Sequence, residues 1–120
     1  MGEKNDRRER QAVQRLDAEY AELKQQLLEI GFALQGSLTE RWMECGKATC
    51  ACREDDGSRH GPYFQWSWKV GGKTKSVFLN PEQAMLCKEW IANNRRLERI
   101  VKRMRSISLR MSQLRGIKGK

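Results

Sequence analysis

Three of the four cysteines and the single histidine of this chain lie between residues 45 and 60. Cys45, Cys50 and Cys52 follow the spacing C-x4-C-x-C, and seven residues separate Cys52 from His60. Three thiolates and one imidazole make up the Cys3His set that zinc binds tetrahedrally. Because the cysteines stand among Gly, Lys, Thr, Arg and Asp and not in an apolar run, we predict that these four residues bind Zn2+.

Two alternatives to this zinc site stay open at the level of the sequence. The spacing differs from the C-x2-C pairs of common zinc ribbons, so the cysteines could be ordinary buried thiols. The fourth cysteine, Cys87, lies in a predicted helix and could replace His60 as a ligand. Four protein ligands leave no position for an activated water, and the sequence has no Gly-rich phosphate loop. We therefore expect a structural metal and no enzymatic activity.

Positive charge is concentrated at the C-terminal end of the chain. The formal net charge is +9, and the last 26 residues carry ten basic side chains and one acidic side chain. A basic tract of this strength predicts a polyanion partner, and on a helix its side chains can contact successive phosphates. We therefore predict a DNA or RNA site formed by Arg95, Arg96, Arg99, Lys102, Arg103, Arg105, Arg110 and Arg115, with Lys73 and Lys75 added from the middle of the chain.

The basic tract belongs to the second of two predicted helices, each with an apolar heptad seam. The first helix is predicted over residues 6–30, with its seam at Val13, Leu16, Tyr20, Leu23, Leu27 and Ile30. The second is predicted over residues 81–115, because Asn80 can cap it, Pro81 suits the first helical position and Gln83 can close a capping box. Its seam includes Trp90, Leu97, Ile100, Met104 and Ile107.

Pairing these seams predicts an antiparallel helical hairpin. Val13, Leu16, Tyr20, Leu23 and Leu27 would pack against Leu97, Ile100, Met104 and Ile107. Asn93, the one polar seam residue, would face the first helix and fix the register. The same seams would also suit a homodimer or docking onto a larger protein, so an interaction module without nucleic-acid binding remains an alternative function.

Between the helices the pattern alternates and predicts strands. Residues 37–45 alternate imperfectly, Tyr63–Trp68 follow a turn, and Gly71-Gly72 can form a hairpin turn into Lys73–Asn80. The expected fold is α+β: a three-stranded antiparallel sheet with a Cys3His zinc knuckle, flanked by two heptad helices in a coiled-coil hairpin. We expect one domain over 1–120, with the knuckle and sheet at 37–80 and a disordered basic tail at 116–120.

Composition limits the remaining possibilities. Hydrophobic residues make up 38% of the chain and charged residues 32%, and the mean hydropathy is −0.81, so the apolar core must be small. No apolar run approaches 18 residues, and the N-terminus lacks the apolar segment of a secretory signal. We therefore expect no membrane segment and a cytoplasmic location, where thiols stay reduced and clustered cysteines favour metal over disulfides.

Several short motifs occur in a fixed order along the chain. They are G-S-L at 36–38, C-G-K-x-x-C-x-C at 45–52, H-G-P-Y at 60–63, G-K-T at 72–74 and E-W-I-x-N-x-R-R-L at 89–97. Together they resemble a family of small uncharacterised bacterial and archaeal proteins, some seen beside mobile elements and labelled transposase-like. The resemblance covers about residues 28–105 and leaves the N-terminal helix largely outside. It implies that the cysteines and His60 act as a set, and it implies no reaction.

Overall fold

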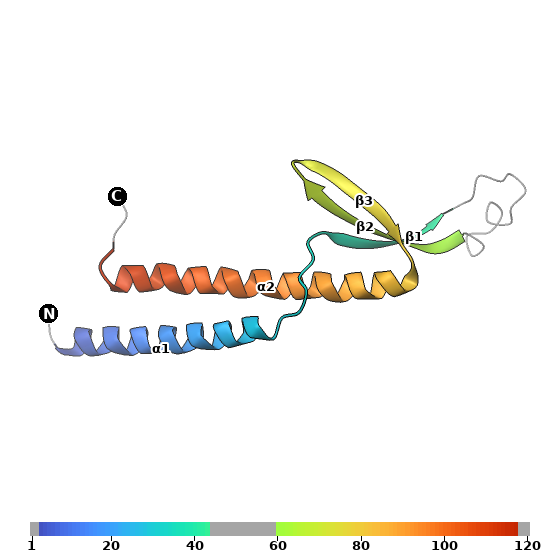
Figure 1. The fold of residues 1–120 in the computed structure, drawn as a ribbon. Coiled ribbons are helices and arrows are strands. Elements are labelled where there is room, and N and C mark those ends of the chain that lie inside the picture. The colour runs from blue at the N-terminus through green and yellow to red at the C-terminus, as the bar shows by residue number, and fades with distance from the viewer. Residues whose placement is uncertain (1–2, 44–59, 118–120) are drawn as a thin grey trace, which may run out of the picture. The chain divides into compact units, whose positions relative to one another are not determined.

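The computed structural model describes residues 3–43 and 60–117, and the elements follow the order helix, three strands, helix (Figure 1). They are α1 (Glu3–Leu28), β1 (Ser37–Met43), β2 (His60–Val70), β3 (Lys73–Leu79) and α2 (Pro81–Leu114). The chain divides into two compact units. The helical unit contains the residues up to Gly31 and those from Arg95 onward, and the sheet unit is Phe32–Asn94.

The helical unit is held by α1 packing against the later part of α2 (Figure 1). Its core consists of Leu23, Ile100 and Ile107, which are 9%, 5% and 3% exposed. The side chains packed around this core are partly buried and come from both helices: Leu16, Tyr20, Leu27, Ile30 and Met104. These residues belong to the two predicted seams, so heptad spacing identified the faces that meet. Val13 and Leu97, the remaining members of the predicted pairing, are half-buried.

The start of α2 has the predicted capping box. Asn80 Oδ1 accepts a hydrogen bond from Gln83 N at 2.7 Å, and Asn80 N donates to Gln83 Oε1 at 3.0 Å. Each side-chain oxygen thus accepts a hydrogen bond from a backbone N–H that has no partner within the helix. Pro81 occupies the first helical position, where a missing N–H costs nothing. The helix therefore begins where the sequence predicts.

Asn93 binds the connector that follows α1. Its Nδ2 donates to the carbonyl oxygen of Phe32 at 2.9 Å. Nearby, Leu34 N donates to Trp90 O at 3.0 Å, and the Phe32 ring meets the Trp90 ring edge-on. The connector belongs to no helix or strand, so its backbone groups form hydrogen bonds with residues of α2.

The sheet has strand order β1-β2-β3, with both pairs antiparallel, as predicted. Gly71 and Gly72 form the β2–β3 turn with φ of 56° and 80°, the positive values that a primed hairpin turn requires. The prediction of a turn before Tyr63 is wrong, because β2 begins at His60. Gly61 permits this extension: its φ is 146°, and a Cβ there would lie 2.7 Å from Arg41 O.

Cross-strand register gives the sheet two distinct faces, because residues directly opposite each other lie on the same side. The tryptophan face contains apolar side chains that are half-buried in β1 and β2: Leu38, Phe64, Trp66 and Trp68. Trp66 and Trp68 stack with ring centroids 3.9 Å apart, and Trp66 Nε1 donates to Gln35 O at 2.9 Å. The other face, which we call the open face, is mainly polar. Within the described residues, neither helix has an apolar stretch long enough to cross a membrane.

The buried seam predicts unequal effects of two leucine substitutions on α1. Leu23→Ala should lower the free energy of unfolding by ~2–5 kcal/mol, because it removes methyl groups from a packed core and leaves a cavity. Leu28→Ala is the matched control, since Leu28 is 79% exposed and its loss should change stability by less than about 0.5 kcal/mol. Urea unfolding of both variants measures the difference. Equal destabilisation would contradict the assignment of Leu23 to the core.

Candidate nucleic-acid interface

Four of the predicted basic residues form a line along α2. Arg95, Arg99, Lys102 and Arg110 are separated by four, three and eight residues, spacings that keep side chains on one face of a helix. All four are exposed, and Arg95, Arg99 and Lys102 lie on the side of α2 away from the buried Ile100. Arg110 also lines a hollow with Leu16 and Glu19 of α1. We call these four residues the outer basic stripe. Fifteen helical residues at about 1.5 Å each give the stripe a length of roughly 22 Å.

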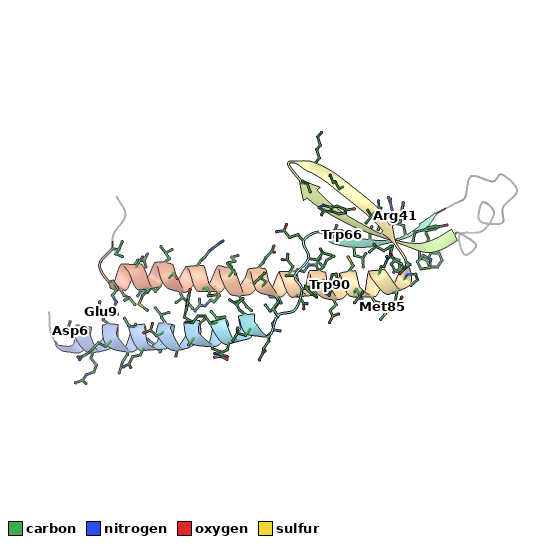
Figure 2. All side chains as sticks on the ribbon, viewed as in Figure 1. Asp6, Glu9, Arg41, Trp66, Met85 and Trp90 are labelled. Atoms are coloured by element: carbon green, nitrogen blue, oxygen red, sulfur yellow. The ribbon has the colours of Figure 1, made fainter. Side chains whose placement is uncertain are left out.

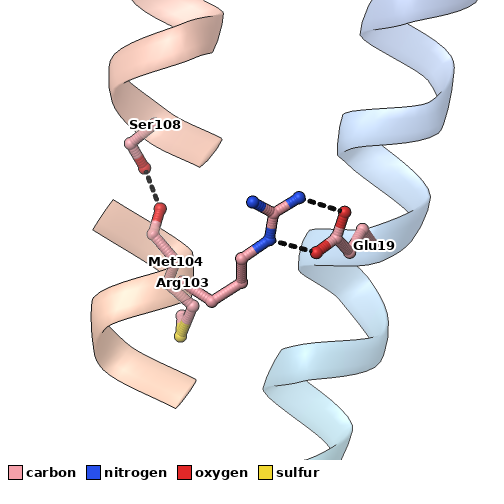
Figure 3. A network of polar contacts seen from close by, with 4 residues as sticks. All are labelled: Glu19, Arg103, Met104 and Ser108. Carbon is pink, nitrogen blue, oxygen red and sulfur yellow. Dashed lines mark hydrogen bonds and ion pairs between the residues drawn. The ribbon is translucent and has the colours of Figure 1, made fainter. Parts of the chain in front are cut away.

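Two other predicted arginines are engaged by acidic residues, one by Glu19 of α1 and one by Glu29 directly after its end. Arg103 forms two hydrogen bonds with the Glu19 carboxylate, one from Nη2 to Oε1 at 2.8 Å and a second from Nε to Oε2 (Figure 3). Arg96 Nη2 lies 3.8 Å from Glu29 Oε2. The hydrogen bond from Arg103, with its positive charge, lowers the pKa of Glu19, and the reverse contacts raise the pKa of Arg103. These two arginines flank the seam and are partly neutralised.

The other two arginines of the predicted set differ in their surroundings. Arg115 lines a hollow of about 520 Å³ together with Asp6, Glu9 and Arg10, so acidic side chains share its site. Figure 2 labels Asp6 and Glu9 on α1. Arg105 is exposed beside the partly buried Met104. A phosphate approaching Arg115 would meet carboxylates as well as the guanidinium. The outer basic stripe therefore offers the longer run of exposed cations, with Arg110 in the same hollow as Glu19 at one end.

The predicted lysines of β3 lie on the tryptophan face. Lys75 is opposite Trp68 and Lys73 is opposite Val70 in the β2–β3 ladder. The open face carries other cations, Arg41 and Lys69, together with Phe78 on β3. Sequence reasoning missed Arg41 and Phe78 as site residues. The sequence shows the alternation within each strand, but only the pairing of the strands shows that Arg41 and Phe78 lie on the same face of the sheet.

The predicted zinc ligands lie mainly outside the described residues. Cys45, Cys50 and Cys52 fall in the 44–59 segment, and the His60 side chain is also outside the description, although its backbone begins β2. Among the described residues, no three His, Cys, Asp or Glu side chains come together as a metal site. The β1–β2 ladder pairs Met43 with His60. The two strands that flank the cysteine segment therefore meet at its ends.

Cys87 occupies an apolar position in α2. Ala84, Cys87 and Ile91 are spaced by three and four residues, and all are buried, with Cys87 only 4% exposed. Burial raises the pKa of the Cys87 thiol, because a thiolate would lose its hydration there. Metal ligation requires the thiolate form. The position therefore suits a packing residue better than a fourth ligand.

The fold and this surface define a small α+β protein that combines a three-stranded sheet with a paired-helix unit bearing exposed cations. The chain belongs to the DUF6788 family, a domain of unknown function whose model matches residues 6–89. The match includes most of α1 and ends before the outer basic stripe, whereas the motifs had pointed to residues 28–105. No curated protein and no solved structure matches the chain.

The Glu19–Arg103 pair predicts a pH-dependent contribution to stability. A lowered pKa in the folded state means that Glu19 stabilises the fold above the ordinary glutamate pKa of about 4.3. That contribution is lost as the pH falls through the lowered value. Glu19→Gln should therefore reduce the melting temperature at neutral pH and leave it equal to the parent's in strong acid.

Glu22→Gln is the matched control, because it removes the same charge from the same helix without breaking an ion pair found in the described residues. Thermal unfolding followed by circular dichroism across a pH series measures all three proteins. A Glu19→Gln deficit that persists unchanged in strong acid would show that the carboxylate charge is not its cause.

Proposed function

We propose that this protein binds nucleic acid through the outer basic stripe of α2. The observation that supports this most directly is the placement of Arg95, Arg99, Lys102 and Arg110 along one exposed face. Arginine and lysine neutralise phosphates and release condensed counterions, which supplies most of the affinity of non-specific binding. Such contacts position a protein on a nucleic acid without reading its bases.

The packing of the helical unit favours this function over a docking module. Leu23, Ile100 and Ile107 are already buried against each other within one chain, so the centre of the seam is filled. A partner using the same seam would first have to displace α1. The resemblance to proteins seen beside mobile elements supports a role accessory to such an element or to recombination. A docking module would remain the explanation if the stripe proved to have no affinity for nucleic acid.

We also propose that Cys45, Cys50, Cys52 and His60 hold one structural Zn2+. The Cys3His composition matches the ligands of closed, tetrahedral zinc sites. The pairing of Met43 with His60 supports the proposal, because a ligand set drawn from both ends of the 44–59 segment requires those ends to be close. Cys87 is buried among apolar positions of α2, and this burial favours His60 as the fourth ligand. A small apolar core also benefits from a metal that joins distant residues.

Neutralising the stripe should weaken binding and reduce its dependence on salt. For duplex DNA, the slope of log affinity against log salt is about −0.9 per phosphate neutralised. The triple variant Arg99→Gln, Lys102→Gln and Arg110→Gln should therefore flatten the slope by about 2.7, and affinity should fall similarly for all sequences. Fluorescence anisotropy with labelled duplexes across a salt series measures both quantities.

A matched control removes three charges from α1 by changing Arg7, Arg8 and Arg10 to Gln, since these side chains are also exposed. The control has the same net charge as the stripe variant, so a shared loss of affinity would indicate a net-charge effect only. A stripe variant that binds as tightly as the parent at low salt would overturn the proposed interface. The docking role would then become the leading explanation.

The metal proposal predicts about one zinc per chain in reduced protein purified without added metal, bound by three sulfurs and one nitrogen. Elemental analysis and X-ray absorption spectroscopy measure the stoichiometry and the ligands. Cys50→Ser should lose the metal, whereas Cys87→Ala should retain it and lose only packing. Metal content that survives Cys50→Ser and disappears in Cys87→Ala would contradict this ligand set.

A further inference from the structure

The open face of the sheet carries aromatic rings that are exposed to solvent. Tyr63 on β2 is 39% exposed and Phe78 on β3 is 59% exposed. The two rings meet edge-to-face, with centroids 6.4 Å apart and an interplanar angle of 69°. The rings of the tryptophan face are more buried, and Trp66 has its Nε1 hydrogen bond satisfied. The open face therefore carries an exposed aromatic pair, whereas Trp66 and Trp68 of the tryptophan face are half-buried.

Cations and neutral hydrogen-bonding groups surround this aromatic pair. Arg41 is opposite Tyr63 on β1, and its Nη1 donates to Gln65 Oε1 at 3.1 Å. Gln65 is in turn opposite Phe78, so arginine, amide and aromatic ring lie side by side across the three strands. Figure 2 labels Arg41 in the sheet. The guanidinium is held beside the rings by this contact.

Farther along the same face lies a second polar region. Ser67 and Ser76 share a hydrogen bond of 2.8 Å between their hydroxyls. A depression of about 360 Å³ is lined by Ser37, Ser67, Lys69 and Thr74 of this face, and also by Gln35, Gly36 and Trp68. Lys69 and Tyr63 are six residues apart on β2, which corresponds to roughly 20 Å of strand. Among its described residues, the open face carries two cations and no carboxylate.

We propose that the open face binds unpaired bases of single-stranded nucleic acid. Phe78, the more exposed ring, is the stacking surface, and Tyr63 supports it from the side, because two rings at 69° cannot both lie flat against one base. Arg41 and Lys69 neutralise the phosphates on either side. This inference rests on the proposed function and gives its substrate class: a nucleic acid with bases free of a duplex.

The chemistry of the face favours this occupant over an apolar protein segment. Two rings are too little apolar surface for a protein interface core, and threonine, serine and glutamine surround them. Stacking needs only the π-face that every base has, and exposed aromatics on a sheet bind unpaired bases in this way. In a duplex both faces of each base are covered by neighbours. Single strands should therefore gain a contact that duplexes lack.

The test compares a labelled single strand of mixed sequence with the duplex formed from it, using the full chain and anisotropy. The parent should prefer the single strand. Base stacking on an aromatic side chain corresponds to about 5- to 150-fold in affinity, so Phe78→Leu should weaken single-strand binding at least fivefold and leave duplex binding unchanged. Tyr63→Leu should have a smaller effect, and Tyr63→Phe should retain binding, since the ring remains.

Trp42→Leu is the matched control, because Trp42 is also an exposed aromatic, at 53%, and lies where the β1–β2 register shifts, so no cross-strand pair places it on the open face. Circular dichroism melts verify that each variant folds. As a second measurement, Arg41→Gln should flatten the salt slope for single strands by about 0.7.

Equal loss in Trp42→Leu and Phe78→Leu would overturn the assignment of the open face, as would parent-like single-strand binding by Phe78→Leu. In both cases the proposed function would still stand if duplex binding were weakened by the stripe variant. A parent protein that binds neither single strand nor duplex would overturn both proposals.

Discussion

The packing of Leu23 of α1 against Ile100 and Ile107 of α2 holds the helical unit together. A chain with only 38% hydrophobic residues has few apolar side chains to bury, so they must be concentrated on one stripe of each helix. Isolated helices are marginal in water, and tertiary contact along the apolar stripe is what makes them stable. The same periodicity that turns Ile100 and Ile107 inward turns Arg99 and Lys102 outward. Stability and the exposed cations are thus two consequences of one heptad pattern.

Acidic residues in and directly after α1 decide which of the basic residues remain available. Glu19 pairs with Arg103, and Glu29 pairs with Arg96. Exposed ion pairs contribute little to stability, and salt weakens them. Their larger effect is on recognition, because a phosphate would have to compete with a carboxylate for these two arginines. Arg95, Arg99 and Lys102 of the outer basic stripe form neither of these ion pairs and are exposed, whereas Arg110 shares a hollow with Glu19.

The sheet separates packing from exposure by its two faces. Trp66 and Trp68 stack on the tryptophan face, and the Trp66 indole donates its only hydrogen bond to the connector at Gln35. Large aromatic side chains stabilise a small sheet because each buries a large apolar area. With that requirement met by one face, the opposite face is free to carry Tyr63 and Phe78 in contact with water. The central strand β2 contributes to both faces and joins both edge strands.

The amino-acid sequence by itself determined the local elements of this protein. Heptad spacing identified the two helices and their facing seams, Asn80 and Gln83 identified the start of α2, and Gly71-Gly72 identified the hairpin turn. These features depend on residues close together in the chain, whose geometry is fixed by the period of a helix or the φ of a turn. The cluster of basic residues was visible for the same reason.

Only the tertiary structure decided which side chains meet across long separations. Asn93 donates a hydrogen bond to the carbonyl of Phe32, a partner that the heptad position of Asn93 does not specify. β2 begins at His60, where it pairs with β1, although the residue types that follow His60 favour a turn. Equally spaced arginines read alike in sequence, yet Arg103 meets Glu19 and Arg99 faces water. Register and pairing join residues distant in the chain, so no local spacing could specify them.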